Sequence, residues 1–347
     1  MKSSTILKPK KMNLIIDIPK KENFGEDAPP INLEISSKNR VISVFDGLGG
    51  SGSTIYEENG EKRTGAYISS RVVSKVVFDF FNNFKNQNMT VDVNTDFIEN
   101  LKTQIITALE EKLKLQKYEV SKLKSSLIRT FPTTLALINC DIEESKTKLD
   151  IIWAGDSRAY ILTANKGLIQ LSKDDLKLDN DPFENLKNDS PLSNMICLEN
   201  DFKLNHKTYF FENPLIVIVA TDGCFGYYST PMHFEYYLLK SIMDSNSDIE
   251  FKYKLEQEFS KVSGDDFSLS LSSIIVKNFN EIKETFRNRF EEVYQYYMKD
   301  ILDLENKIIE LNRTILENEN KKNILEQQKN EKNMELWSEY KSTNFNL

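Results

Sequence analysis

A predicted strand runs into the stretch Val44-Phe45-Asp46-Gly47-Leu48-Gly49-Gly50, so that an aspartate follows an apolar run directly. The arrangement recurs at Ala220-Thr221-Asp222-Gly223, and Gly264-Asp265-Asp266 lies just before the alternating run 267–276. Glycine has no Cβ, so an Asp-Gly pair at a strand end lets a carboxylate and a nearby carbonyl face one small volume. A single pair of this kind is a common turn. Three acidic turns, each at a strand end or start, are together a far more specific signal than one.

A fourth acidic turn, Gly155-Asp156-Ser157, lies between two runs of a dense β region. Converging carboxylates repel one another unless cations neutralise them. The chain has only two histidines, His206 and His233, which disfavours a multi-histidine metal site and a Ser-His-Asp triad. We expect both histidines to be solvated or locally hydrogen-bonded. Any metal is then held by carboxylates, the ligands of hard ions such as Mg²⁺ and Mn²⁺.

The chain of 347 residues is acidic, with a net charge of −8 and an isoelectric point near 5.2. This charge disfavours non-specific binding to nucleic acid and to anionic membranes. The longest apolar runs, such as 215–220, are far shorter than the roughly 20 residues of a membrane-spanning helix, and the lysine-rich N-terminus lacks the apolar core of a secretory signal. The three scattered cysteines Cys140, Cys197 and Cys224 fit a reducing compartment. We therefore expect a cytoplasmic protein that binds neither nucleic acid nor membrane.

Apolar periodicity predicts an α+β fold over the first 278 residues. Spacings of three and four residues predict helices, whereas alternation and short apolar runs predict strands. The predicted helices are 65–84, 96–117, 233–243 and 249–262. The predicted strands are 13–18, 40–45, 133–141, 148–154, 158–163, 215–221 and 267–276. The stretch 173–194, rich in Asp, Asn and Pro, is predicted to be a loop.

In this order and at these separations, the acidic turns resemble those of the metal-dependent protein phosphatases, the PPM or 2C-type Ser/Thr phosphatases, in a bacterial-like form. The resemblance covers roughly residues 12–277, nearly all of the globular part. It rests on the stretches Glu26-Asp27, 44–50, Thr133-Thr134-Leu135-Ala136, 153–160, 169–174, 219–223 and 265–268.

This resemblance implies a central β-sandwich flanked by helices, in α-β-β-α layers, with a binuclear metal centre at one edge. It implies that phosphoserine and phosphothreonine on proteins are hydrolysed by a hydroxide that bridges two Mn²⁺ or Mg²⁺ ions, and that a third ion binds more weakly. Asp46 and Asp222 are the implied catalytic residues: Asp46 bridges the two ions and Asp222 ligates one of them. Glu26 and Asp27 act through water, and Asp156 helps to hold the third ion. The implied metal site consists of Glu26, Asp27, Asp46, Gly47, Asp156, Asp222 and Asp265.

Several positions depart from the family pattern. Glu22 stands where members often have an arginine that grips the substrate phosphate, so Lys20 and Lys21 are the candidate substrate-binding residues. Leu48 stands where eukaryotic members have a histidine and many bacterial members a methionine. Two further departures are Pro132 and Asp175. They leave open an alternative: a catalytically weak pseudophosphatase that scaffolds a partner through its helical C-terminus.

After residue 278 proline and glycine disappear, and apolar residues recur at alternating spacings of four and three. The residues of this stripe are Phe290, Tyr294, Tyr297, Ile301, Leu304, Ile308, Leu311 and Ile315. Such a heptad seam predicts a left-handed coiled coil, and it weakens from Asn318 onward. We expect a homodimer or a hetero-partner complex through 290–325, and a phosphoprotein substrate that is a Ser/Thr kinase or its target.

The sequence therefore predicts four regions. They are an N-terminal tail at 1–11, a 2C-type phosphatase domain at 12–278, a helical or coiled-coil extension at 279–340 and a tail at 341–347.

Overall fold

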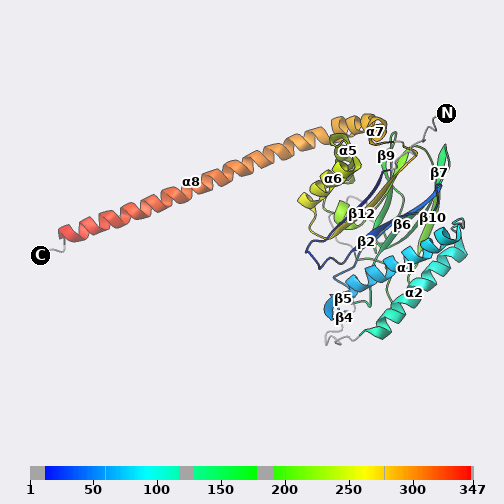
Figure 1. The fold of residues 1–347 in the computed structure, drawn as a ribbon. Helices are drawn as coiled ribbons and strands as arrows, with labels where there is room; N and C mark the ends of the chain where they lie inside the picture. Colours follow the sequence, from blue (N-terminus) through cyan, green and yellow to red (C-terminus); the bar gives the residue numbers. More distant parts are fainter. Residues whose placement is uncertain are drawn as a thin grey trace, which may run out of the picture. The chain divides into compact units, whose positions relative to one another are not determined.

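The computed structural model describes residues 12–58, 60–116, 128–177, 191–199, 201–276 and 278–344. The chain divides into two units between Glu292 and Val293, and Figure 1 traces both. The first unit contains the β-sheets and the candidate site. The second consists of helical structure alone in its described part.

Two five-stranded antiparallel sheets form the centre of the first unit. The first sheet has the order β1 (Asn13–Ile18), β12 (Phe267–Ile274), β11 (Leu215–Ala220), β8 (Arg158–Thr163) and β9 (Gly167–Gln170). The second sheet has the order β10 (Asn205–Glu212), β7 (Lys146–Ala154), β6 (Leu135–Ile142), β3 (Asn39–Phe45) and β2 (Ala28–Glu34). A separate hairpin pairs β4 (Ile55–Glu58) with β5 (Glu61–Thr64).

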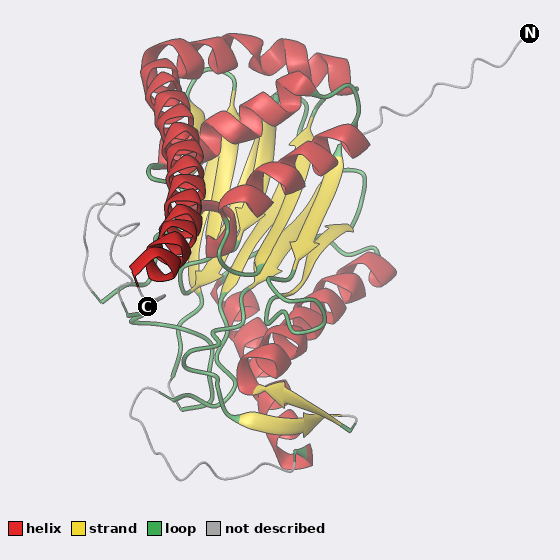
Figure 2. Cartoon of the chain, turned by 90° about the vertical axis from the view of Figure 1, so that its left-hand side faces the viewer, coloured by secondary structure: helices red, strands yellow, loops and turns green. Residues whose placement is uncertain are grey.

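Helices cover the outer face of each sheet, as Figure 2 shows. The pair α1 (Gly65–Gln87) and α2 (Thr95–Leu115) packs on the second sheet through β2 and β3. The pair α5 (Pro231–Asp244) and α6 (Asp248–Val262) lies on the first sheet, together with the short α4 (Asp222–Phe225). The expected α-β-β-α sandwich is therefore confirmed.

Apolar side chains from both sheets meet in one cluster between them. Val44 and Ile151 enter this cluster from the second sheet, and Ile161 and Val217 enter from the first. All six residues of β11 are buried, because a central strand of this sheet is covered by the other sheet on one face and by helices on the other. This explains why β11 is a continuous apolar run without alternation.

Each helix of the α1–α2 pair begins at a side-chain cap. The Thr64 hydroxyl accepts a hydrogen bond from the backbone N–H of Tyr67, and the Asn94 side chain accepts one from Phe97. Such caps satisfy backbone donors that lack an intrahelical partner. The Phe80 and Phe97 rings then meet edge to face at 5.0 Å between centroids, which joins the two helices above the sheet.

The predicted strands and helices are all present, with ends that differ by at most three residues from the structure. β1 and β8 begin and end at the predicted residues. Of the predicted loop 173–194, residues 178–190 lie outside the described part of the chain. The sequence prediction omitted β2, β4, β5, β9, β10 and α4, and it placed α7 (Phe279–Val293) within the helical extension.

Helix α7 belongs to the first unit up to Glu292, although the sequence placed this segment in the extension. Ile282 and Phe286 are buried. The Arg289 guanidinium pairs with the Glu235 carboxylate of α5 at 2.7 Å, and the Phe290 ring stacks on Tyr236 at 6.0 Å. These contacts make α7 part of the layer that contains α5.

A π-helical turn, η1 (Tyr294–Met298), separates α7 from α8 (Lys299–Asn344). The long helical extension that the sequence predicted is therefore confirmed. A π turn holds more residues than an α turn, so it shifts the helical phase. Phe290 consequently does not lie on one continuous stripe with Ile301, and the predicted seam is corrected: its unbroken part begins after the π turn. No described helix combines the length and apolar character that a membrane-spanning segment requires.

Candidate metal centre and substrate pocket

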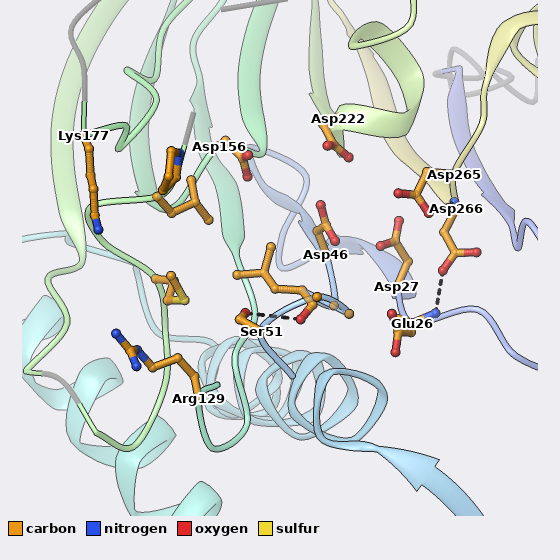
Figure 3. Close-up of a pocket in the computed structure, with 17 residues that line it drawn as sticks. Glu26, Asp27, Asp46, Ser51, Arg129, Asp156, Lys177, Asp222, Asp265 and Asp266 are labelled. Carbon is orange, nitrogen blue, oxygen red and sulfur yellow. Dashed lines mark hydrogen bonds between the residues drawn. The ribbon is translucent and has the colours of Figure 1, made fainter. Parts of the chain in front are cut away.

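A cavity of about 740 Å³ opens at one end of the sandwich, and carboxylates from both sheets line it. Figure 3 shows these side chains gathered on one side of the cavity. Asp46 follows β3, Asp156 lies in the turn between β7 and β8, and Asp222 follows β11. The complete acidic lining is Glu26, Asp27, Asp46, Asp156, Asp222, Asp265 and Asp266. The cavity thus brings together all seven residues that the sequence assigned to the metal site, Gly47 included.

The turn that carries Asp46 is fixed by two threonines. The Thr133 hydroxyl donates to the Asp46 carbonyl at 2.5 Å, and the Thr134 N–H donates to the same oxygen at 2.9 Å. Gly47 pairs with Thr133 as an isolated bridge, and a Cβ at Gly47 would overlap the Glu26 carbonyl. The turn therefore requires glycine, because the N-terminal segment passes directly against it.

A second network joins the strand ends of the first sheet to Asp27. The Thr221 hydroxyl donates to Asp27 Oδ2 at 3.0 Å and accepts from the Ser268 N–H at 2.9 Å. Asp266 accepts from the backbone N–H groups of Glu26 and Lys20, at 2.5 and 2.7 Å. Asp266 therefore positions the segment that carries Glu26 and Asp27.

These carboxylates hold their protons unusually tightly in the protein without ions. Removal from water, followed by repulsion from Asp266 and Asp222, raises the pKa of Asp27 to about 8. Removal from water and the charge of Asp222 raise the pKa of Asp156 to about 8. The same causes, burial first and then Asp27, raise the pKa of Asp46 well above its usual 3.8. One Asp156 oxygen, Oδ1, is buried without a hydrogen-bond partner in the described part of the chain.

This donor set fits divalent cations. A bound cation would stabilise the ionised form of these carboxylates, whose pKa values are raised, and would give Asp156 Oδ1 a partner. Among the described residues, no three Asp, Glu, His or Cys side chains are placed to surround a single ion. Mg²⁺ usually keeps several water ligands and binds to proteins through one or two carboxylates. The carboxylate oxygens of this cavity are the donor type that such hard ions prefer.

The opposite side of the cavity is basic. Arg129 and Lys177 line it, and Figure 3 shows both on the side away from Asp27 and Asp265. The Arg129 N–H donates to the Ser51 carbonyl at 2.9 Å, which fixes this backbone against the turn that follows Asp46. Neither cation is predictable from the sequence, because neither stands in a motif.

The predicted substrate-binding residues Lys20 and Lys21 are not among the residues that line the cavity. Lys20 contacts the site through its backbone N–H, which donates to Asp266. The Lys21 ammonium lies 4.5 Å from the centre of the Phe24 ring. Both lysines are exposed, and neither lines this cavity.

Asp175, a departure from the family pattern, has a positioning role. Its carboxylate accepts hydrogen bonds from the Gly155 N–H at 3.0 Å and from the Asn194 and Asn205 amides at 2.7 and 3.0 Å. Its backbone N–H donates to the Gly155 carbonyl. These bonds hold the turn that carries Asp156. Leu48 lines the cavity and has no proton to donate.

The two histidines, Trp153 and the three cysteines lie outside the cavity lining. His233 is buried, and its Nδ1 lies 2.6 Å from the Thr230 hydroxyl. His206 lies 3.5 Å from the carboxylate of Asp150 on β7. The Trp153 indole donates to the Lys173 carbonyl at 2.7 Å. Cys140, Cys197 and Cys224 are buried free thiols.

No protein-family model and no curated protein matches the chain. Among solved structures, the serine/threonine phosphatase Stp1 from Staphylococcus aureus is similar, with 14% identity and a TM-score of 0.53 over 80% of this chain and 100% of that one. A bacterial serine phosphatase, solved as a single-substitution variant, is similar with 13% identity and a TM-score of 0.51 over 76% of this chain and 98% of that one. The first unit thus has the fold of the bacterial PPM Ser/Thr phosphatases, as the sequence predicted.

Proposed function

We propose that this protein is a metal-dependent phosphatase that hydrolyses phosphoserine and phosphothreonine on proteins. One observation carries the proposal: carboxylates from five separate turns line one cavity, where burial and then their mutual repulsion raise the pKa values of Asp27, Asp46 and Asp156. A folded chain tolerates such repulsion where cations bind. The similarity of the fold to a serine/threonine phosphatase supports a metal-binding role for these carboxylates.

In this proposal Asp46, Asp222 and Asp265 hold two Mn²⁺ or Mg²⁺ ions directly, with the Gly47 carbonyl as a further ligand. Glu26 and Asp27 hold water molecules around the ions, and Asp156 holds a weaker third ion with Asp222. A bound pair of divalent ions supplies an activated water and neutralises the phosphoryl oxygens. Thr221 and Asp175 keep Asp27 and the Asp156 turn in place through the hydrogen bonds described above.

Arg129 and Lys177 give the cavity a second, cationic side. The protein carries a net charge of −8, so two cations that face a cavity can attract an acidic group of a phosphoprotein against this overall charge. In this proposal they bind acidic residues beside the substrate phosphate, and they are candidate substrate-binding residues in addition to Lys20 and Lys21. The physiological substrate in this view is a phosphorylated Ser/Thr kinase or its target, and the three free cysteines support a cytoplasmic location.

A second candidate function is binding without turnover, in which the fold acts as a scaffold. Leu48 favours it, because this side chain offers no proton to a leaving alkoxide. The two candidates differ in one measurable property: only the phosphatase releases product.

Hydrolysis of p-nitrophenyl phosphate with Mn²⁺, with and without chelator, separates the two candidates. The phosphatase proposal expects turnover that chelator abolishes and that Asp222→Asn removes. Asp79→Asn is the matched control, because Asp79 is an exposed aspartate of α1 paired only with Lys75 among the described residues. Mn²⁺-dependent turnover that survives Asp222→Asn would place the activity elsewhere. Binding of Mn²⁺ without any turnover would favour the scaffold.

A further inference from the structure

Helix α8 carries many exposed apolar side chains. Among the described residues, 25 large apolar side chains are exposed, and 12 of them lie on α8. The second unit has no other described element that could cover them, because only the π turn η1 precedes the helix. Leaving such a stripe in water is unfavourable, so the helix face needs an occupant.

The residue types on the stripe identify that occupant. Ile301, Ile308 and Ile315 repeat every seven residues, and leucines stand three residues after the first two. In heptad terms the isoleucines are at a, and Leu304, Leu311 and Leu325 are at d. β-branched residues at a with leucine at d favour two parallel strands. We propose that α8 pairs with α8 of a second copy of this chain as a parallel two-stranded coiled coil.

Exposure along the seam agrees with this pairing. Ile308 is 57% exposed and Leu311 is 62% exposed in the single chain. Both positions insert between side chains of the facing helix in a coiled coil. Association of two copies would bury these side chains without any change in the helix itself.

Charges beside the seam favour the parallel orientation. In a parallel pair, Lys321 at g faces Glu326 at e of the second copy, which is attractive. Asp300 at g faces Glu305 at e, which is one like-charge contact at the start of the seam. In the antiparallel register that overlaps 301–325 fully, Glu305 comes near Glu319 of the second copy, and Lys307 comes near Lys321. Both of those contacts join like charges.

The structure also limits the length of the paired region. The π turn Tyr294–Met298 shifts the helical phase before the seam begins. Towards the C-terminus Asn318 takes a d position, and Lys322 and Lys329 take a positions. Pairing is therefore tightest between Ile301 and Ile315. The polar seam residues fix the register instead of adding stability.

The mass of the full-length protein in solution tests the pairing. Light scattering or sedimentation over a wide concentration series should give twice the chain mass of 40.2 kDa. Ile308→Asp should reduce it to one chain mass, because a carboxylate cannot be buried in the seam. Ile309→Asp is the matched control. Ile309 is the next residue along the chain, is 65% exposed and lies at b, outside the seam. This variant should keep the double mass.

Circular dichroism of both variants checks that helix and sheet content are retained, so that loss of the dimer is separated from loss of folding. A wild-type protein of one chain mass would overturn the proposal and point to a different protein as the occupant. An Ile308→Asp variant that keeps the double mass would overturn the assigned seam.

Oxidative cross-linking tests the orientation. In a parallel pair, Leu304→Cys and Leu325→Cys each lie opposite themselves and should each form an intermolecular disulfide. Arg313→Cys, on the outer f position, should not. In a full-overlap antiparallel pair Leu304 and Leu325 lie far from their own copies, so failure of both cross-links in a protein of double mass would overturn the parallel arrangement. These readouts do not involve phosphatase activity and stay informative if the proposed function fails.

Discussion

Asp156 shows at the scale of one residue how sequence and site are related. Its position after Gly155, between two strands, makes it predictable as a site residue. The hydrogen bonds that hold its turn are not predictable, because Asp175, Asn194 and Asn205 come from other segments of the chain. The same contrast separates the aspartates at strand ends, which follow a local pattern, from Arg129, whose place in the cavity depends on packing over long sequence distance.

Leu48 carries a prediction about leaving groups. Because this residue cannot protonate an alkoxide, aryl phosphates should be hydrolysed much faster than phosphoserine peptides. Leu48→His should raise the rate on alkyl substrates, and positioned acid–base groups contribute roughly 10²–10⁴-fold where they act. The comparison is kcat for p-nitrophenyl phosphate and for a phosphoserine peptide in both proteins. Equal rates across leaving groups in the wild type, with chemistry rate-limiting, would contradict this account.

Arg129 carries a prediction about substrate choice. Arg129→Gln should raise KM for a phosphopeptide with acidic residues beside the phosphate by about tenfold, the scale of one hydrogen bond to a charged group. It should leave kcat for p-nitrophenyl phosphate unchanged, because this small substrate has no second acidic group. Lys75→Gln, an exposed lysine of α1, is the control. If KM changes neither with the charge of the peptide nor in Arg129→Gln, the cationic side of the cavity is excluded as a binding site for acidic residues.

At the scale of elements, the central strands of the two five-stranded sheets are predictable, whereas of their four edge strands only β1 was predicted. β11 and β8 are apolar throughout or nearly so, because both of their faces are covered. β2 and β10 are the edge strands of the second sheet. β2 contains Pro29 and Pro30, which an edge strand tolerates because it has fewer ladder bonds to lose. β10 is partly or fully exposed along its length, so its sequence has no clear apolar alternation.

Helix α7 allows an element-scale prediction. A chain that ends at Glu292 keeps Ile282, Phe286 and the Arg289–Glu235 pair, whereas a chain that ends at residue 278 loses all of them. Buried apolar side chains of this size contribute roughly 1.5–3 kcal/mol each. The shorter chain should therefore be less stable by at least about 3 kcal/mol. Urea unfolding of both truncated proteins measures the difference, and equal midpoints would show that α7 does not stabilise the first unit.

At the scale of the whole molecule, the sequence predicted a sandwich followed by a helical extension, and the structure has both. The boundary between the two units was less predictable. In the sequence, the spacing of apolar residues continues from α7 into α8, and this spacing does not indicate which of these residues pack on α5. The π turn lies between α7, which packs on α5, and the exposed α8, and the heptad spacing of the sequence does not predict it.

Crowded carboxylates should make the stability of the whole ion-free protein depend on pH. The pKa of Asp27 is raised from 3.8 to about 8 in the folded state, so between these values the folded chain holds a proton that the unfolded chain has lost. The free energy of unfolding should therefore fall as pH rises from about 4 to 8. Thermal melts in chelator across this range should show a falling Tm. Asp27→Asn should flatten the trend, and added Mn²⁺ should raise Tm most at high pH. A Tm that rises over this range in chelator would contradict the raised pKa of Asp27, which burial and then the neighbouring carboxylates cause.

The most direct test of the central claim is phosphate release from a phosphothreonine peptide as Mn²⁺ is titrated into chelator-treated protein. We predict no release without the ion, saturable release with it, and a loss for Asp46→Asn that exceeds the roughly 10–100-fold typical of an outer-shell partner. Asp79→Asn should behave as the wild type does. Release that needs no divalent ion, or that Asp46→Asn leaves unchanged at saturating Mn²⁺, would contradict a metal-dependent phosphatase at this site.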